Sequence, residues 1–466
     1  MPFREDGMVN RYISVLIVLG ISLFISGIAN SQHNEQACEI VQITSGDLGS
    51  RDPAVCGDGT GILFISRADL LNNGHPDQED LFFADITDPF NPVFFQLTNT
   101  PENERGISIS DDCTEIGFNS RSNLTGGNPS NFDQMFYADI SNLNSPVFTQ
   151  LTNTAVNNAS ANGTVSGNGT KLTLSTQEDL TGMNPDGSIE FFIFDADNLV
   201  VPFGQLTDDP TNSGSITSTP IIDTNGSRVA FTSSEDYVPP GTNPNGGRQL
   251  FLSQIAYNSP NPPVSQLFQL TNFPDNDFFA QGPAITPDGN KILFGSNFNI
   301  TGDNPDETTE LFLVDVANPA SPMFAQITKS TLFTASTGII NSTASLISFI
   351  TSNPFFTGSG EQIILADIID PKDPQFRLLT NFPNGSEVDD LSSPDEFTFI
   401  AFESDSDLIP GGNTDETEEI YILFPDTCGL VVGSSIPTLS QWGLIAMAGV
   451  LGIIGLIAVR RRNVTV

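Results

Sequence analysis

The residues of this chain that could do chemistry are mostly oxygen ligands on short polar loops. Five segments share glycine and asparagine, four of them with proline and three with aspartate, at 126–129, 182–186, 241–245, 302–306 and 411–415. Carboxylate and carbonyl oxygens suit Ca²⁺, and the best candidate ligands are Asp303, Asp306, Glu310, Asp415 and Glu419. The same residue types also shape tight turns without metal, so the sequence requires no cofactor and leaves Ca²⁺ open.

Groups for nucleophilic or metal catalysis are scarce. The sequence has two histidines, His33 and His75, which are too few for a multi-histidine zinc site. It has no Gly-x-Ser-x-Gly elbow and no Walker loop. Paired carboxylates stay open, because acids abound and their separation in sequence does not give their separation in space. The sequence favours a protein that is not an enzyme, with an extracellular hydrolase or lyase as an alternative.

The net charge is strongly negative. The 466 residues include 56 acids and 16 basic residues, which gives a formal charge of −40. Such a surface repels phosphate backbones and argues against nucleic acid as a partner. Since 38% of the residues are hydrophobic, including 36 Phe, the chain has ample material for a core. The charge therefore indicates a soluble exported surface or cation binding.

The elements that position these groups follow from a repeat. Gln-Leu-Thr or Gln-Ile-Thr begins at residues 42, 96, 150, 205, 269 and 326, and Leu378-Leu379-Thr380 is a seventh copy. A period of this size indicates one supersecondary unit stacked many times. In the fifth unit we expect strands at 283–286, 291–296, 310–315 and 323–328, with a turn at 287–290. Four short antiparallel strands per unit predict the blades of an all-β propeller.

The two ends of the repeat predict how the ring closes. Seven sets of first-to-third strands are present, the last set lacks a fourth strand, and an orphan strand lies at 39–44. We therefore expect a seven-bladed β-propeller over 38–428, closed by the N-terminal strand. Alignment of the repeats places Cys38 and Cys428 in one loop, where a disulfide would staple the ring. Cys56 and Cys113 lie at corresponding turns of adjacent blades and form either a second disulfide or two free thiols.

The blade pattern resembles a known repeat family. The turn Pro287-Asp288-Gly289, the strand 291–294 and the strand 310–315 are similar to the TolB-type, WD40-like propeller repeat. The resemblance covers about 38–428, although the Trp-Asp dipeptide of true WD40 blades is absent. It implies a scaffold whose members bind proteins, peptides or small ligands, and the fold alone does not give the function.

The N-terminus has the features of a secretory signal peptide over residues 1–31. Arg4 and Arg11 precede an apolar stretch at 12–29, and small residues follow at the cleavage position. An uncleaved anchor is the alternative. Export would place all four cysteines in an oxidising compartment, where disulfides persist.

The C-terminus carries a second pattern after a linker at 429–435. The motif residues are Ile436, Pro437, Thr438, Leu439, Trp442 and Gly443, and the tail residues are Arg460, Arg461 and Arg462. The apolar segment 444–459 between them is just long enough for a transmembrane helix, and the arginines would stay in the cytoplasm. Residues 436–466 resemble the IPTL-CTERM sorting signal of Gram-negative bacteria. That resemblance implies recognition by an exosortase-type protease, cleavage near the motif and transfer to the cell surface. A permanent single-pass anchor is the alternative.

Taken together, these features predict export across the inner membrane, membrane anchoring through the C-terminal helix, and then display on the cell surface. The propeller is expected to act as a binding module for a protein or glycan on its loop-rich face. The alternatives are a hydrolase or lyase with an acidic site at the channel mouth, or a structural matrix protein that depends on Ca²⁺.

Overall fold

The computed structural model describes residues 38–428, except 73, 75–77, 156–159, 162, 210–217, 238–242, 276, 330–337, 352–360 and 384. The predicted signal peptide, linker, sorting motif, transmembrane helix and arginine tail lie outside the described residues, as do both histidines. No helix within the described ranges is long and apolar enough to cross a membrane.

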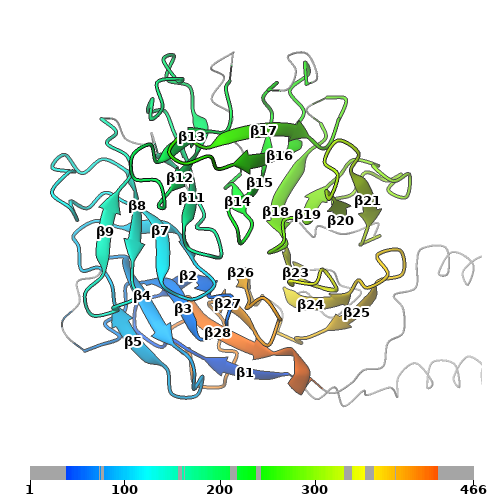
Figure 1. Cartoon of the computed structure of the whole chain (residues 1–466). Coiled ribbons are helices and arrows are strands. Elements are labelled where there is room, and N and C mark those ends of the chain that lie inside the picture. Colours follow the sequence, from blue (N-terminus) through cyan, green and yellow to red (C-terminus); the bar gives the residue numbers. More distant parts are fainter. Residues whose placement is uncertain are drawn as a thin grey trace, which may run out of the picture.

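The described chain forms seven four-stranded antiparallel sheets, arranged as blades in a ring (Figure 1). Blade 1 contains β2 (Ser50–Val55), β3 (Gly61–Ser66), β4 (Asp80–Asp85) and β5 (Val93–Gln96). Blade 2 contains β6 (Glu104–Ile109), β7 (Glu115–Ser120), β8 (Gln134–Asp139) and β9 (Val147–Gln150). Blade 3 contains β10 (Ser160–Ala161), β11 (Lys171–Thr176), β12 (Glu190–Asp195) and β13 (Phe203–Gln205). Blade 4 contains β14 (Ile221–Ile222), β15 (Arg228–Ser233), β16 (Gln249–Ala256) and β17 (Val264–Gln269).

The remaining blades follow the same order. Blade 5 contains β18 (Ala280–Ile285), β19 (Lys291–Ser296), β20 (Glu310–Asp315) and β21 (Met323–Gln326). Blade 6 contains β22 (Gly338–Ile340), β23 (Leu346–Thr351), β24 (Gln362–Asp367) and β25 (Gln375–Leu378). Blade 7 contains β26 (Asp389–Ser392), β27 (Ile400–Ser404), β28 (Glu419–Phe424) and β1 (Glu39–Gln42), and the 3₁₀ turn η1 (Pro425–Thr427) follows β28.

The ring closes as predicted. β1 pairs antiparallel with β28, with Glu39 opposite Phe424 and Gln42 opposite Tyr421. In Figure 1 the dark-blue β1 lies beside the orange β28 at the lower rim. The N-terminal strand therefore supplies the outer strand of blade 7, which protects the edge of β28.

Strand bounds in blade 5 match the prediction for β19 and β20 and differ for the two outer strands. β18 begins at Ala280 because a bulge between Gln281 and Ala284 interrupts the sequence pattern. β21 ends at Gln326 because Thr328 turns back to bond the third strand, as described below.

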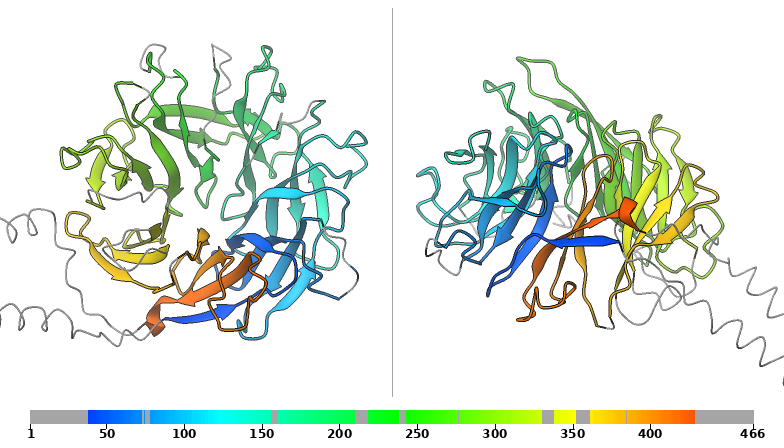
Figure 2. Two further views of the ribbon diagram at one scale, coloured as in Figure 1. Left: turned by 180° about the vertical axis from the view of Figure 1, so that it is seen from behind. Right: turned by 90° about the horizontal axis from the view of Figure 1, so that it is seen from below.

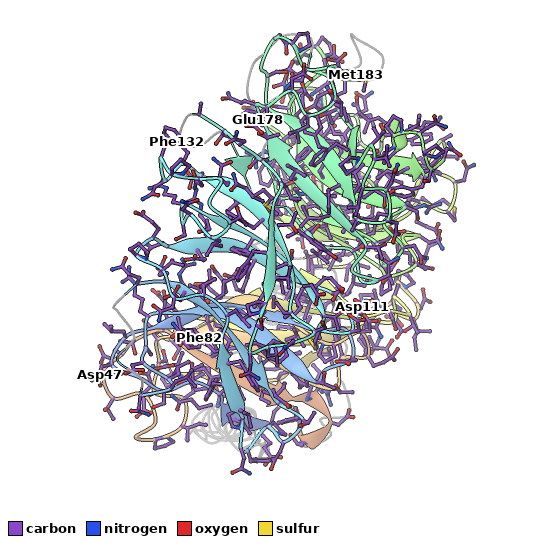
Figure 3. The ribbon with its side chains drawn as sticks, turned by 60° about the vertical axis from the view of Figure 1, so that its left-hand side comes forward. Asp47, Phe82, Asp111, Phe132, Glu178 and Met183 are labelled. Carbon is purple, nitrogen blue, oxygen red and sulfur yellow. A yellow bond between two sulfur atoms is a disulfide. The ribbon has the colours of Figure 1, made fainter. Side chains whose placement is uncertain are left out.

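The core lies between the blades. The middle strands β3 and β11 are buried along their whole length, because each blade packs between two neighbours. Paired aromatic rings recur across these strands; Phe64 and Phe82 of blade 1 stack with centroids 5.9 Å apart, and Phe118 and Phe136 of blade 2 lie 5.5 Å apart. Figure 3 labels Phe82 within its sheet. Stacked aromatic pairs of this kind contribute beyond their buried area.

The connections of each blade sort to two faces, which the edge-on view of Figure 2 separates. We call the face with the turns between first and second strands the turn face. The loop face carries the loops between second and third strands and the links between blades. On the turn face, backbone hydrogen bonds join neighbouring turns, such as Asp58 N to Asp111 O (2.9 Å) and Asp395 N to Gly57 O (3.1 Å).

The turn face is also narrow at its centre. The Asp111 carboxylate, on the turn labelled in Figure 3, accepts a hydrogen bond from Thr224 Oγ1 at 3.1 Å. These residues belong to blades 2 and 4, which are not neighbours. Burial raises the pKa of Asp111. The turns of the turn face thus bind one another, and the loop face is the better candidate for a ligand site.

Candidate functional site

The threonine of the repeated Gln-Leu/Ile-Thr motif locks the fourth strand to the third in every blade. Its Oγ1 accepts a hydrogen bond from the second backbone N–H of the third strand. The pairs are Leu81 with Thr98, Met135 with Thr152, Phe191 with Thr207, Leu250 with Thr271, Leu311 with Thr328, Ile363 with Thr380 and Ile420 with Thr44, at 2.8 to 2.9 Å. In the sequence this motif only marks where each repeat falls. In the structure its threonine forms a hydrogen bond that locks the fourth strand to the third.

Two of the predicted Ca²⁺ ligands lie beside this lock. Glu419 begins β28 and is 1% exposed; its carboxylate accepts hydrogen bonds from Thr44 Oγ1 (2.5 Å) and Gly46 N (2.8 Å). Burial raises the pKa of Glu419 to about 7, although these hydrogen bonds act in the opposite direction. Glu310 begins β20 in the same way, is 1% exposed, and accepts a hydrogen bond from Thr308 Oγ1 at 3.2 Å.

The other three predicted ligands lie on exposed loops. Asp303 pairs with Lys329 Nζ at 3.0 Å, Asp306 accepts from Thr308 Oγ1 at 3.2 Å, and Asp415 accepts from Thr417 Oγ1 at 3.3 Å. The five predicted ligands are therefore divided between blades 5 and 7, which are not adjacent in the ring. Ca²⁺ binding by these residues stays a prediction.

The asparagine of each polar loop is a buried clamp. Asn304 Nδ2 donates to the carbonyls of Asn297 (3.2 Å) and Thr308 (2.8 Å), at the two ends of its loop. The same arrangement recurs at Asn128, Asn184, Asn243 and Asn413. These contacts support turn shaping as the role of the repeated asparagines.

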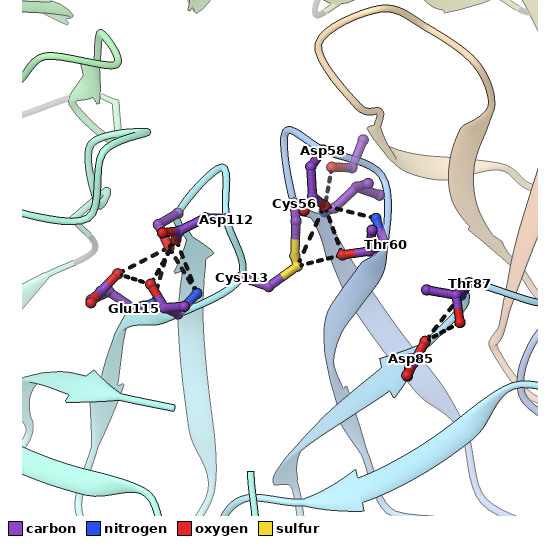
Figure 4. Close-up of a disulfide and its surroundings, with 12 residues drawn as sticks. Cys56, Asp58, Thr60, Asp85, Thr87, Asp112, Cys113 and Glu115 are labelled. Carbon is purple, nitrogen blue, oxygen red and sulfur yellow. Dashed lines mark hydrogen bonds between the residues drawn. A yellow bond between two sulfur atoms is a disulfide. The ribbon is translucent and has the colours of Figure 1, made fainter. Parts of the chain in front are cut away.

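Both expected cysteine pairs are disulfides. Cys38 is joined to Cys428, and Cys56 is joined to Cys113. The first bond links the start of β1 to the residue after η1 and so ties the two ends of the ring. The second joins the turns of blades 1 and 2 (Figure 4), where Cys113 Sγ also lies 3.3 Å from Thr60 Oγ1.

Three carboxyl groups meet where blade 7 adjoins blade 1. Asp52, Asp390 and Glu403 each place a carboxylate oxygen within 4.8 Å of the others. Glu403 Oε2 accepts a hydrogen bond from Asp52 N at 2.6 Å, and Arg51 pairs with Asp52. Loss of hydration and repulsion from neighbouring acids raise the pKa of Glu403 to about 8 and that of Asp390 to about 6. This seam cluster can hold protons near neutral pH.

The residue type at this cluster departs from that of other blades with the same backbone bulge. The innermost strands of blades 1, 2, 5 and 7 share a bulge at the same place. Its first residue is left-handed in each case, with φ between 47° and 59°; it is Gly106 in blade 2, Gly282 in blade 5, Asp52 in blade 1 and Asp390 in blade 7. Glycine adopts this conformation without strain, whereas aspartate does so at some cost. Strain of this kind concentrates at functional sites.

A pocket of about 360 Å³ lies at the same seam on the loop face. Blade 1 contributes Gly49, Arg51, Ile65, Arg67 and Glu79, and blade 7 contributes Asp405, Glu416, Thr417 and Glu418. Arg51 Nη2 lies 3.0 Å from Glu79 Oε2, and Arg67 Nε lies 3.6 Å from Glu79 Oε1. One carboxylate thus orients two guanidinium groups at the mouth of the pocket.

Blade 2 repeats this arrangement beside the pocket. Arg105 Nη2 and Arg121 Nε lie 2.5 Å and 2.9 Å from the same Oδ1 of Asp133. The Asp133 side chain is 0% exposed. Burial alone would raise the pKa of Asp133, and the hydrogen bonds from the two arginines overcome this and lower it.

The four arginines and the seam cluster were not among the site residues expected from the sequence. A signal for the arginines was present, since Arg51 to Arg105, Arg67 to Arg121 and Glu79 to Asp133 each span the repeat spacing that separates Gln42 from Gln96. No comparable signal marked the seam cluster, because its residues do not repeat: the counterpart of Asp52 in blade 2 is Gly106, and that of Glu403 in blade 1 is Ile65.

The comparisons with known proteins agree with this architecture. Residues 434–462 match the family described as the IPTL-CTERM motif, which confirms the predicted sorting signal. No curated protein gives a significant match to the sequence. The sorting signal and the disulfides together indicate export to the cell envelope or surface.

Several solved structures share the fold. An oligogalacturonate lyase in complex with manganese superposes with a TM-score of 0.54 at 14% identity, covering 84% of this chain and 94% of the lyase. A prolyl endopeptidase gives 0.55 at 12% identity over 91% of this chain and 53% of its own, so this chain spans about half its length. TolB from Acinetobacter baumannii gives 0.39 at 14% identity, covering 70% of this chain and 65% of TolB. The first two support a β-propeller and nothing beyond the fold, and the third is too distant to add an argument.

Proposed function

We propose that this protein is an exported binding module that is anchored through its C-terminal segment, recognised by an exosortase-type protease and displayed on the surface of a Gram-negative cell. It binds a protein or glycan on its loop face without catalysis. The observation that carries this proposal is the seam pocket, which gathers exposed charged groups of both signs on that face.

The exit point of the chain supports the choice of face. Cys428 follows β28 and η1 and therefore lies at the turn-face end of blade 7. The seven residues 429–435 between Cys428 and the sorting motif span at most about 25 Å when extended. A tether at this point leaves the loop face directed away from the membrane.

Photo-crosslinking in intact cells tests this proposal. A photoreactive amino acid replaces Thr417, which lines the pocket, in the full chain. The matched control carries it at Phe90, a residue 60% exposed in the connection between β4 and β5 on the turn face. We expect a discrete adduct from position 417 that is absent at 90. Adducts from position 90 alone, or from neither position, would refute binding at the seam pocket.

A second candidate function is supported by the seam cluster. Close carboxyls with raised pKa values are typical of acid and base catalysis, and Glu403 and Asp390 have this property. In this alternative, Glu403 donates a proton and an ionised neighbour acts as base in a hydrolase or lyase acting on an acidic saccharide.

The catalytic alternative is tested by incubating the exported protein with oligogalacturonate and measuring new chain ends. Activity that is lost in Glu403→Gln and retained in Glu104→Gln would support it. Glu104 is a suitable control because it is another buried glutamate with a raised pKa, about 9, but lies outside the cluster. Equal activity in Glu403→Gln and the parent protein would exclude this role for Glu403.

A further inference from the structure

Three positions at the loop-face rim change charge from blade to blade. They are the second residue of the first strand, the residue after the second strand, and the residue before the third strand. Blade 1 has Arg51, Arg67 and Glu79; blade 2 has Arg105, Arg121 and Asp133. The corresponding residues of blade 7, aligned through the pairing of β26 with β27, are Asp389, Asp405 and Glu418. We call these nine residues the charged strip.

The charged strip is continuous over three adjacent blades. Ser50 N donates to Glu418 O at 2.7 Å, which joins blade 1 to blade 7, and Glu104 N donates to Glu79 O at 3.0 Å, which joins blade 2 to blade 1. Side chains of blades 7 and 1 line the same pocket. A ligand can therefore contact all three blades along one path.

The sign of the charge reverses along this path. Blade 7 contributes three acids and no base, whereas blades 1 and 2 each contribute two arginines and one acid. Only eleven basic residues lie between Cys38 and Cys428, and four of them are in the strip. This concentration distinguishes the strip from the acidic surface as a whole.

The arginines keep donors for a ligand. The side chains of Arg67, Arg121 and Arg105 are 50%, 38% and 37% exposed. Each guanidinium has five N–H donors. Arg105 and Arg121 share the carboxylate of Asp133, whereas Arg51 and Arg67 share that of Glu79 and Arg51 also pairs with Asp52. Exposed ion pairs add little to stability, so the half-exposed Arg67 and the two arginines that share Asp133 are better explained by recognition of an anionic group. The planar guanidinium binds such a group through two hydrogen bonds.

We propose that the charged strip binds a polypeptide segment in which a block of basic side chains is followed by a block of acidic ones. The basic block lies along blade 7 and the acidic block along blades 1 and 2. This inference rests on the proposed binding function and names the class of its partner. Nucleic acids carry charge of one sign, and both blade 7 and the net charge of −40 repel them.

Calorimetric titration of the exported protein with synthetic peptides tests the proposal. The probes are a peptide with a lysine block and a glutamate block joined by glycines, a scrambled peptide of the same composition, and all-lysine and all-glutamate peptides of equal length. We expect the block peptide to bind at least about tenfold more tightly than the other three. Equal or tighter binding of the all-lysine or scrambled peptide, or no binding of the block peptide, would overturn the proposal.

Charge reversal assigns the binding to the strip. The double variant Arg67→Glu/Arg121→Glu should weaken block-peptide binding by about tenfold or more, and the milder Arg67→Gln/Arg121→Gln covers the case in which reversal impairs folding. The matched control is Lys329→Glu, because Lys329 is an exposed cation of similar type, 41% exposed and paired with Asp303 after β21 of blade 5. Equal loss of affinity in the control would indicate a general charge effect and overturn the assignment.

The two proposals can fail separately. Crosslinking at Thr417 without peptide discrimination would reject the block-charge partner and leave the binding function standing. Absence of crosslinks at Thr417 would reject binding of a cellular partner at the seam pocket, whatever the peptides do.

Discussion

The junction of blades 7 and 1 and the junction of blades 1 and 2 share one backbone arrangement but carry different side chains. At the first junction, Asp52 and Asp390 occupy left-handed bulges and meet Glu403. At the second, the corresponding bulge residue of blade 2 is Gly106, and blade 1 has Ile65 at the position of Glu403. The shared features, such as the threonine lock, set the fold of both junctions. The difference lies in residue type at positions where one blade departs from its siblings, and the acids there have raised pKa values.

Removal of the two disulfides gives the largest expected losses of stability at these junctions. Cys38–Cys428 spans 390 residues and Cys56–Cys113 spans 57. Since the entropy lost by the unfolded chain grows with loop length, Cys38→Ser/Cys428→Ser should lower the free energy of unfolding by roughly 3–5 kcal/mol, about 1–2 kcal/mol more than Cys56→Ser/Cys113→Ser. Denaturant titration of both variants measures this. A larger loss at the junction of blades 1 and 2 would contradict the view that ring closure depends on the N-terminal strand.

The pH dependence of stability separates the buried acids of the two junctions. Glu403 has a pKa of about 8 in the folded protein and an ordinary value of 4.5. Between these pH values the folded state keeps a proton that the unfolded state has released, so the free energy of unfolding falls as the pH rises. Glu403→Gln should reduce this fall by on the order of 2–4 kcal/mol between pH 5 and 8.

The corresponding variant at the junction of blades 1 and 2 is Glu104→Gln. Burial, and then repulsion from Asp80, raise the pKa of Glu104 to about 9. The decrease in unfolding free energy that Glu104 causes should therefore continue to a higher pH than the decrease caused by Glu403. Thermal melts of the parent protein and both variants from pH 5 to 9 measure the two curves. A parent protein that gains stability as the pH rises over this range would show that the acids are ionised without penalty.

Replacing the unusual bulge residues should convert one junction toward the other. Asp52→Gly/Asp390→Gly removes left-handed strain and repulsion near Glu403, and we expect a gain of about 1 kcal/mol at pH 8, with less at pH 5. Gly106→Asp in blade 2 introduces the strain without the cluster and should cost about 1 kcal/mol. Chemical denaturation at both pH values measures these effects. A loss of stability in the double glycine variant would mean that Asp52 and Asp390 stabilise the seam.

The smallest expected contrast is between the arginine pairs of blades 1 and 2. Arg105→Ala removes one of the two arginines that pair with Asp133, whose side chain is 0% exposed. We expect it to lower the free energy of unfolding by about 1 kcal/mol. Arg67→Ala should change stability by less than about 0.5 kcal/mol, because its contact with Glu79 is 3.6 Å long and half-exposed. Differential scanning calorimetry compares the two variants. Equal losses of unfolding free energy in the two variants would show that the burial of Asp133 does not strengthen its ion pair relative to that of Glu79.

The fold could be predicted further than the site because the fold is repeated. The motif around Thr98 and its six counterparts returns in every blade, so a single chain contains its own comparison. The unpaired strand at Glu39 and the incomplete last blade then left one way to close the ring, and the cysteine positions agreed with it.

The seam cluster could not be predicted in this way. Its members are unlike their counterparts in other blades, so the repeat carries no signal for them. Their meeting depends on bulges in β2 and β26 that turn Asp52 and Asp390 toward each other, and sequence separation does not show a bulge. The five acids predicted as Ca²⁺ ligands stand out in the sequence because their loops recur from blade to blade. In the folded chain they are divided between blades 5 and 7.

The disulfide between Cys38 and Cys428 also determines how the molecule would bear a mechanical load. A pull applied to the chain beyond Cys428 reaches β1 through a covalent bond, because the two cysteines flank the paired strands β1 and β28. β28 therefore cannot be peeled from β1 one hydrogen bond at a time from its C-terminal end. In a tethered propeller, a load on the tether would therefore act on β1 and β28 together, and these two strands would leave blade 7 only as a pair.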